Sequence, residues 1–308
     1  MMRKFFTQTK REFWECRTSF IKAPLVTAGI LIGLLLLGIA PWHHRIAGLV
    51  ERQQVNHPEV SVFGSEVFSE LNKHQNVTTE VGYLVHGFAA VYTIFALILL
   101  LVLAFYFTDT LYSDRRDQSI LFWKSMPISE RDTVLSKLAA GVVGAPAIYA
   151  GAALATGAAF LLIFIVYAGF IWNIPVPSVG AMAGIFFKCA VGLVLGWLLM
   201  AAWYLPIFCW LMFCSAFVRK SPFLMALGGP LALMVLEKWV LGSHHSFQII
   251  GTHIAAGFYH FELVINNLSA LPDQLMATAS ALQFWLGLAT GGALLFASVW
   301  LRANRWEI

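Results

Sequence analysis

The sequence has 308 residues, of which 59% are apolar and 12% are charged. Soluble domains carry about 25% charged residues, so this composition excludes an ordinary soluble domain and indicates an integral membrane protein. The formal net charge of +4 does not indicate a nucleic-acid-binding protein, because no basic cluster is interleaved with aromatic residues in a soluble domain.

The first 22 residues are predicted to form an amphipathic helix that lies along the inner membrane surface. Phe6, Phe13 and Phe20 recur on one face, and polar residues such as Gln8 and Glu12 are expected on the other face. The charged stretch is too long for a cleaved signal peptide, and five more hydrophobic segments follow the first one. A plain cytoplasmic extension of the first membrane helix is the alternative.

Six hydrophobic segments are long enough to cross a bilayer, which takes about 20 residues. Asn and Pro residues around 173–178 end the third segment, which would otherwise be too long for one crossing. The predicted fold is all-α, with one transmembrane domain over residues 1–308. Membrane helices are predicted at 24–41, 82–108, 129–171, 183–217, 223–241 and 280–301, joined by outer segments at 42–80 and 242–279 and by a cytoplasmic loop at 110–128.

The basic residues set the predicted orientation, because Lys and Arg accumulate in short cytoplasmic segments. Six precede the first membrane helix, five lie in or beside the loop at 110–128, and four follow the fourth and sixth helices. The alternate loops hold only Arg45, Arg52 and Lys73, while Lys188 and Lys238 lie at helix ends. Both termini and the loop at 110–128 are therefore predicted to be cytoplasmic.

Small residues mark predicted contact faces between membrane helices, because they let two backbones approach closely. Gly151 and Ala155 form such a face in the third helix, and Gly287 and Gly291 form a GxxxG pair in the sixth. Prolines inside helices permit kinks, which suit a moving bundle but also occur in static membrane proteins. These kinks are expected at Pro146, Pro206 and Pro230.

The sequence carries no recognisable catalytic or metal-binding motif. The cysteines have no CxxC spacing, so neither structural zinc nor a disulfide is expected. Histidines are expected in the outer segments, among them His43 and His44, but neither HExxH nor GxSxG is present. The GxxxxGK[ST] loop that binds nucleotide phosphates is also missing. We therefore expect no cofactor, no metal and no enzymatic activity in this chain, and any nucleotide would be bound by another chain.

The charged stretch DRRDQSILFWKSMPISERDTVLSKL, residues 114–138, lies between two very apolar segments. A short helix is predicted over 114–125 and is ended by Pro127, after which Ser129 is expected to cap the third membrane helix. The apolar tip at 120–123, flanked by both signs of charge, is typical of a protein docking surface. A segment that only rests on the membrane surface is the alternative.

Three stretches carry a family resemblance: KREFWECR at 10–17, LYSDRRDQSILFWKSMPISERDTVLSKL at 111–138, and WYLPIFCWLMFCSAFVRKSPFLMALGGPLALMVLEK at 203–238. They are similar to the permease subunits of type-2 ABC exporters, the ABC-2 family. The resemblance implies that 110–128 holds the coupling helix, which sits in a groove of a separate ATPase subunit, and that 242–279 is an extracytoplasmic hairpin. It implies an ATPase-contact role for Asp114, Arg115, Arg116, Asp117, Leu121, Trp123 and Lys124.

The function that this resemblance implies is export across the bacterial inner membrane. Two such permeases, identical or homologous, would bind two copies of the ATPase, which would hold ATP and Mg, and the chain would contact membrane lipid. The outer loop at 42–80 matches no feature tied to a substrate, so the cargo is not implied. Two other functions stay open. One is a non-transporting assembly or sensor subunit that binds the ATPase, and the other is a membrane-embedded, metal-dependent hydrolase using His44, His245 or His253.

Overall fold

The fold is helical throughout the part of the chain that the structure, a computed structural model, describes: residues 2–56, 80–118, 129–167 and 178–304. These ranges contain no strand. The α-helices are α1 (Met2–Glu15), α2 (Ala23–Asn56), α4 (Glu80–Arg116), α6 (Glu130–Ala139), α7 (Ala145–Phe164), α8 (Val179–Phe217), α9 (Pro222–Leu241), α10 (His245–Asn266), α11 (Leu271–Ser280) and α12 (Leu282–Asn304). Two π-helical turns, at Thr18–Lys22 and Ala140–Gly144, and a short 3₁₀ helix, Leu268–Ala270, join some of them.

Six of the described helical segments are long and apolar enough to cross a membrane, which confirms the prediction of six spans and a multi-pass membrane protein. They are Thr18–Ile39, Leu84–Arg116, Glu130–Tyr167, Val179–Phe217, Pro222–Leu241 and Leu282–Asn304. The longest, α8, has 39 residues and is therefore about 58 Å long at 1.5 Å per residue. A hydrocarbon core is about 30 Å thick, so α8 either tilts strongly or extends beyond the core.

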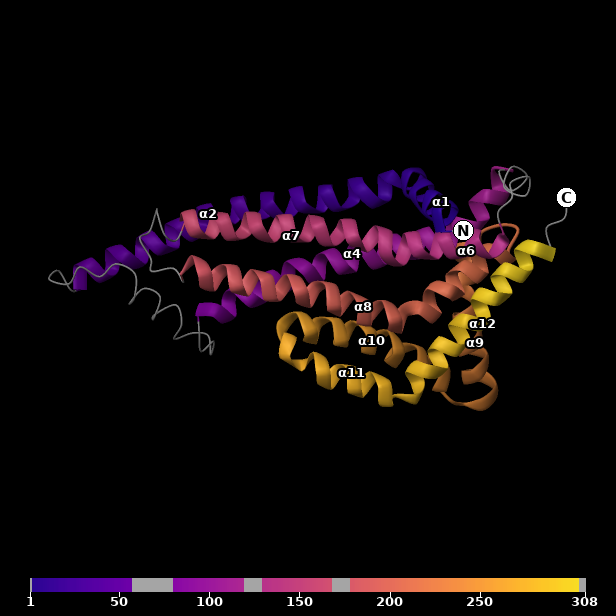
Figure 1. The fold of residues 1–308 in the computed structure, drawn as a ribbon. Coiled ribbons are helices and arrows are strands. Elements are labelled where there is room, and N and C mark those ends of the chain that lie inside the picture. Colours follow the sequence, from indigo (N-terminus) through magenta and orange to yellow (C-terminus); the bar gives the residue numbers. More distant parts are fainter. Residues whose placement is uncertain (1, 57–79, 119–128, 168–177, 305–308) are drawn as a thin grey trace.

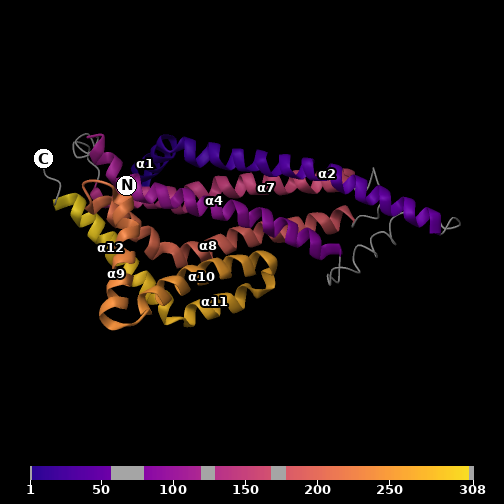
Figure 2. The ribbon, with the colours of Figure 1, turned by 180° about the vertical axis from the view of Figure 1, so that it is seen from behind.

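Four long helices form the body of the molecule. Figure 1 shows α2, α7, α4 and α8 running side by side, and Figure 2 shows the same order from behind. Helix α8 is central, because it packs against α4 on one side and against α10 and α12 on the other. The hairpin made by α10 and α11 lies along α8, while α9 and α12 lie toward the end of the bundle that also holds α1 and α6 (Figure 1). We call this the junction end.

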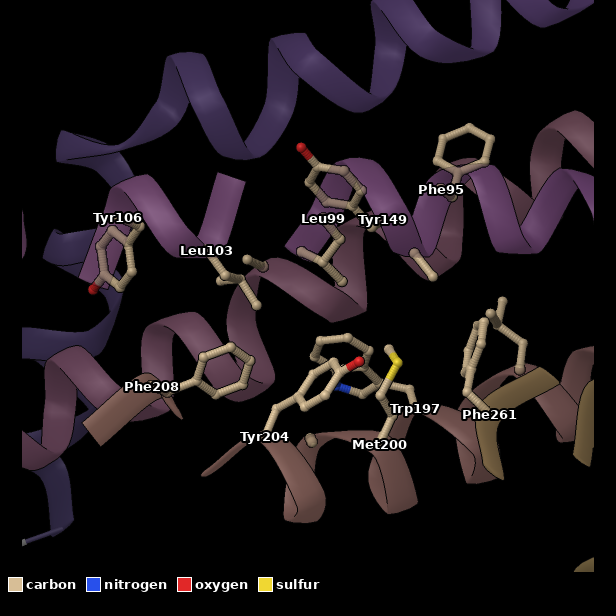
Figure 3. Packing of buried hydrophobic residues seen from close by; sticks show 14 of the residues in the cluster. Phe95, Leu99, Leu103, Tyr106, Tyr149, Trp197, Met200, Tyr204, Phe208 and Phe261 are labelled. Carbon is tan, nitrogen blue, oxygen red and sulfur yellow. The ribbon is translucent and has the colours of Figure 1, made fainter. Parts of the chain in front are cut away.

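The core lies between α4 and α8 and is largely aromatic. Phe95, Leu103 and Phe107 of α4 are fully buried, as are Met200 of α8 and Phe261 of α10. Figure 3 shows several of these side chains facing one another across the interior. A membrane protein can have an apolar core and also apolar outer faces, because those outer faces contact lipid.

Glycines set the distance between α8 and its two partners. A Cβ at Gly196 would lie 3.2 Å from the backbone oxygen of Phe261 in α10, a tighter contact than most Cβ atoms make, so glycine favours this close approach. In α12, a Cβ at Gly291 would lie 3.2 Å from the Cα of Pro206 in α8, and one at Gly287 would lie 2.9 Å from the ring of His253. The GxxxG pair therefore lies against α8 and α10.

The two small residues singled out in the third membrane helix have a different environment. A Cβ at Gly151 would meet nothing within 4 Å, and Ala155 is exposed. Within the described ranges, this face of α7 is therefore not covered by another helix. The helix contact predicted at Gly151 and Ala155 is therefore not found among the described residues.

Tryptophans of α8 satisfy carbonyls that prolines leave without a helical donor. A proline lacks the N–H that would bond to the carbonyl four residues earlier. Four residues before Pro146 the carbonyl of Val142 accepts a hydrogen bond from Trp197 Nε1 at 3.2 Å. Similarly, four residues before Pro230 the carbonyl of Ala226 accepts one from Trp210 Nε1 at 3.1 Å. These bonds tie α7 and α9 to α8.

Candidate functional site: the charged junction

Five ionisable side chains from four helices meet at the junction end, and we call this group the charged junction. Its members are Glu12 of α1, Asp114 of α4, Glu130 and Lys137 of α6, and Arg302 of α12. Lys137 Nζ lies 2.9 Å from Glu12 Oε2 and 3.3 Å from Asp114 Oδ1. Arg302 Nη1 lies 2.7 Å from Asp114 Oδ2, and Arg302 Nε donates to Glu130 Oε2.

The two cations of the charged junction are almost completely buried. The side chains of Lys137 and Arg302 are each 3% exposed, and those of Asp114 and Glu12 are 8% and 9% exposed. Buried charges are retained only where they are paired and hydrogen-bonded, and removing one partner of such a pair costs about 3–5 kcal/mol. The charged junction is therefore a fixed attachment between α1, α4, α6 and α12.

The charged junction holds three carboxylates and only two cations. One carboxylate is thus not fully neutralised, and burial raises the pKa of Glu12 above its ordinary value, although the Lys137 ammonium acts in the opposite direction. The Nη2 of Arg302 is buried and has no hydrogen-bond partner within the described residues.

Neighbouring hydrogen bonds fix the end of α4 to α6 and α8. Tyr106 donates from its hydroxyl to the carbonyl of Lys137 at 3.0 Å. Arg115 donates to the carbonyls of Ser215 and Val218 at the end of α8. The hydroxyl of Ser215 in turn accepts hydrogen bonds from two backbone N–H groups of α4, those of Leu111 and Tyr112.

The expected ATPase-contact residues have several different environments. Asp114 and Arg115 point into the protein, where they bond to α6, α12 and α8 as described above. Arg116 and Asp117 are 53% and 59% exposed and pair with each other at 3.0 Å. Leu121, Trp123 and Lys124 lie outside the described residues. Of the described members, only Arg116 and Asp117 have side chains open to a second protein.

The charged junction brackets the segment at 119–128. Asp114 lies just before the segment and Glu130 just after it, and both carboxylates bind the same side chain, Arg302. Helix α4 ends at Arg116, and Gln118 has a positive φ of 56°, a conformation common where helices end. At the other side, Ser129 Oγ accepts a hydrogen bond from the N–H of Asp132 at 3.1 Å, which confirms the predicted cap.

The prediction that the polar face of the N-terminal helix is exposed to water is wrong. Glu12 and Gln8 were expected to face water, yet both are buried. Glu12 can be buried because the ammonium group of Lys137 compensates the charge of its carboxylate. Phe20 is fully buried and packs on the ring of Tyr106 at 5.1 Å, and Phe13 packs on Phe20 at 6.2 Å.

These contacts show α1 held on the protein by aromatic and ionic groups. The side chain of Phe6 lies outside the described part of α1. The helix also ends earlier than expected, at Glu15. A π-helical turn at Thr18–Lys22 follows, shortly before Pro24. A widened turn gives the proline ring room beside the preceding carbonyls.

Sequence reasoning missed the partnership of Glu12, Lys137 and Arg302. Glu12 was expected to face water, and Lys137 and Arg302 were used only to predict the membrane orientation. A signal was present, because Asp114, Lys137 and Arg302 all lie near predicted cytoplasmic ends of membrane helices and therefore at similar depth. Ionisable groups at such positions normally pair with one another. The contribution of α1 had no comparable signal.

The histidines of the α10–α11 hairpin take part in packing. His253 Nε2 donates to the carbonyl of Trp203 at 2.7 Å, and burial lowers the pKa of His253. His260 stacks on Trp203 and bonds to Gln274 Oε1 at 2.6 Å. Across the described ranges, no group of three His, Cys, Asp or Glu side chains could hold a metal ion.

Comparison with known proteins assigns no family to this chain. No protein-family model matches it, and neither curated proteins nor solved structures give a significant match. The function is therefore inferred from the charged junction, the membrane helices and the sequence.

Proposed function

We propose that this chain is the transmembrane permease subunit of an ATP-binding cassette exporter of the bacterial inner membrane. In this proposal two permeases, identical or homologous, bind two copies of a separate ATPase, which holds ATP and Mg. The chain itself performs no chemistry. Both of its termini and the segment at 119–128 face the cytoplasm, where the ATPase lies.

One observation carries the proposal: the segment expected to bind the ATPase is flanked on both sides by residues of the charged junction. A force applied to that segment would reach α4 through Asp114 and α6 through Glu130, and both carboxylates are bound to Arg302 of α12. Mechanical coupling between subunits needs a stiff element at the contact, because a flexible one would absorb the displacement. Buried ion pairs supply that stiffness.

The distribution of basic residues supports the orientation. Basic residues of α1, α4, α6 and α12 and of the turn between α8 and α9 gather at the junction end: Lys10, Arg11, Arg115, Arg116, Arg131, Lys137, Arg219, Lys220 and Arg302. Positive charge concentrates on the cytoplasmic side of bacterial membrane proteins. The first candidate span begins at the junction end and the last one ends there (Figure 1).

The test is affinity purification of the chain from its native membranes, followed by identification of bound proteins. We expect an ATPase with a phosphate-binding loop to be recovered. Arg116→Glu should abolish its recovery, because Arg116 is exposed beside the segment at 119–128 and its contacts with Asp109, Tyr112 and Asp117 all lie within residues 109–117. Arg115 is unsuitable for this test, since its reversal would also break the bonds to α8.

The matched control is Lys220→Glu, which makes the same charge reversal at the junction end but between α8 and α9. It should leave both membrane insertion and ATPase recovery intact. Recovery of the ATPase by the Arg116→Glu variant at the wild-type level would contradict the proposed contact. Recovery of an ATPase by a chain that moves nothing across the membrane would instead support an assembly or sensor subunit.

A further inference from the structure

A cavity of about 410 Å³ lies between α7 and α8. Buried residues of α4, among them Phe95 and Leu99, form its floor. Tyr149 and Trp197 stand on the two walls, and Phe261 of α10 contributes a further part. Figure 3 shows these five side chains around the space between the upper and lower helices.

The lining of the cavity offers almost no hydrogen-bonding group. Only three of its residues have polar atoms in their side chains. Tyr149 donates its hydroxyl to the carbonyl of Ser19 at 3.2 Å, and Trp197 donates to the carbonyl of Val142. The hydroxyl of Tyr92 has no partner within the described residues. A buried water needs two to four polar partners, so ordered water would not fill this cavity.

The cavity opens on a surface that is itself apolar. Its rim includes Val143 of the π-helical turn before α7, Gly151 of α7, and Val194 and Leu198 of α8, all of which are exposed. These residues lie inside two candidate membrane spans, Glu130–Tyr167 and Val179–Phe217. In a membrane the opening would therefore face hydrocarbon rather than water.

A hydrogen bond joins the two walls of the cavity toward the junction end. It runs from Trp197 of α8 to Val142 of the π-helical turn before α7, and both are among the lining residues nearest to that end. A molecule could thus enter sideways from the membrane and would lie along α4. A volume of about 410 Å³ is within the roughly 300–1,000 Å³ of typical ligand sites.

We propose that this cavity binds a hydrocarbon chain of a membrane lipid, which enters between α7 and α8. The occupant is apolar because the walls would leave polar groups without partners. We infer that the occupant is a lipid chain because the opening lies among exposed apolar residues of membrane-spanning helices, which lipid chains surround. The inference is independent of the proposed ATPase partner.

The experiment uses the full chain alone in lipid nanodiscs that contain a trace of phosphatidylcholine with a photoreactive diazirine near the end of one acyl chain. After illumination, mass spectrometry maps the labelled peptides. We expect labelling at 142–154 and 193–198 to exceed labelling on α9, whose surface faces lipid with few buried residues. The comparison with α9 separates a bound chain from ordinary lipid contact.

Two substitutions fill the cavity from opposite walls, Gly151→Phe and Val194→Phe. Gly151 tolerates the change, because a Cβ there meets nothing within 4 Å. Gly184→Phe on α8 is the matched control, since Gly184 is equally open but does not line the cavity. Labelling of 142–154 and 193–198 should be lost in both filled variants and kept in the control.

Three results would overturn the proposal. The first is labelling of the two segments that is no stronger than that of α9 in the unaltered chain. The second is labelling that persists in both filled variants while all variants elute as folded protein. The third is crosslinking of the rim residues to a second copy of the chain, which would make the cavity part of a protein interface.

Discussion

Replacing Lys137 by methionine should strongly destabilise the protein, because the change removes a buried cation and leaves its partners in place. Asp114 would keep Arg302 at 2.7 Å, whereas Glu12 would lose the only cation that the structure places within 4 Å of it. The cost is thus mainly that of one buried, unpaired carboxylate, about 3–5 kcal/mol.

Pairing the change with Glu12→Leu should recover most of this loss, since replacing both members of a buried ion pair by apolar residues is often neutral or stabilising. The free energy of unfolding can be measured for both single variants and the double variant by titration with SDS in mixed micelles. Together they form a double-mutant cycle, which isolates the coupling between the two side chains.

Arg116→Met serves as the control, because it removes an exposed cation from the end of the same helix as Asp114 and should change stability little. The reasoning would be refuted if Lys137→Met cost less than about 1 kcal/mol, the range of an exposed ion pair. It would also be refuted if Glu12→Leu failed to rescue Lys137→Met, because the two changes would then be independent.

Three further predictions concern single residues. Trp197→Phe keeps most of the ring but leaves the carbonyl of Val142 unsatisfied, which should lower the free energy of unfolding by about 1–3 kcal/mol; an unchanged stability would count against the proline-compensating bond. Gly192→Val should separate α8 from α10, since a Cβ at this position would lie 3.1 Å from the carbonyl oxygen of Val264; proteolysis of the α10–α11 hairpin should become faster, and an unaltered rate would contradict this. For Glu12, whose folded pKa is raised above its ordinary value of 4.5, the folded state binds the proton more readily, so its contribution to stability should increase as pH falls toward 4.5 and disappear in Glu12→Gln. Parallel pH profiles of the two proteins would show that Glu12 is not the group involved.

Hydropathy was sufficient to predict the six spans, because a bilayer crossing requires a long apolar helix and little else. Local chemistry was sufficient at Ser129, where an N-cap residue and an acidic first turn are adjacent in sequence. These features depend on residues a few positions apart. The amphipathic pattern of the N-terminus also depends on residues a few positions apart. The pattern alone did not show that Gln8 and Glu12 on its polar face are buried in the protein.

The contacts that position the candidate site depend on residues far apart in sequence. Glu12 meets Lys137 across 125 positions, and Arg302 meets Asp114 across 188 positions. The spacing of residues within one helix does not indicate which residue of another helix it will pair with. The bonds from Trp197 and Trp210 are similar, because a proline signals a free carbonyl but not the side chain that will satisfy it.

Docking of an ATPase on the segment at 119–128 is the central claim, and crosslinking from position 123 tests it most directly. A photoreactive amino acid would replace Trp123 in the full chain expressed in its native membrane, and the crosslinked product would be identified by mass spectrometry. We predict a crosslink to a subunit with a phosphate-binding loop. Crosslinks to lipid alone, or modification of position 123 by a membrane-impermeant reagent added from outside the inner membrane, would contradict the claim.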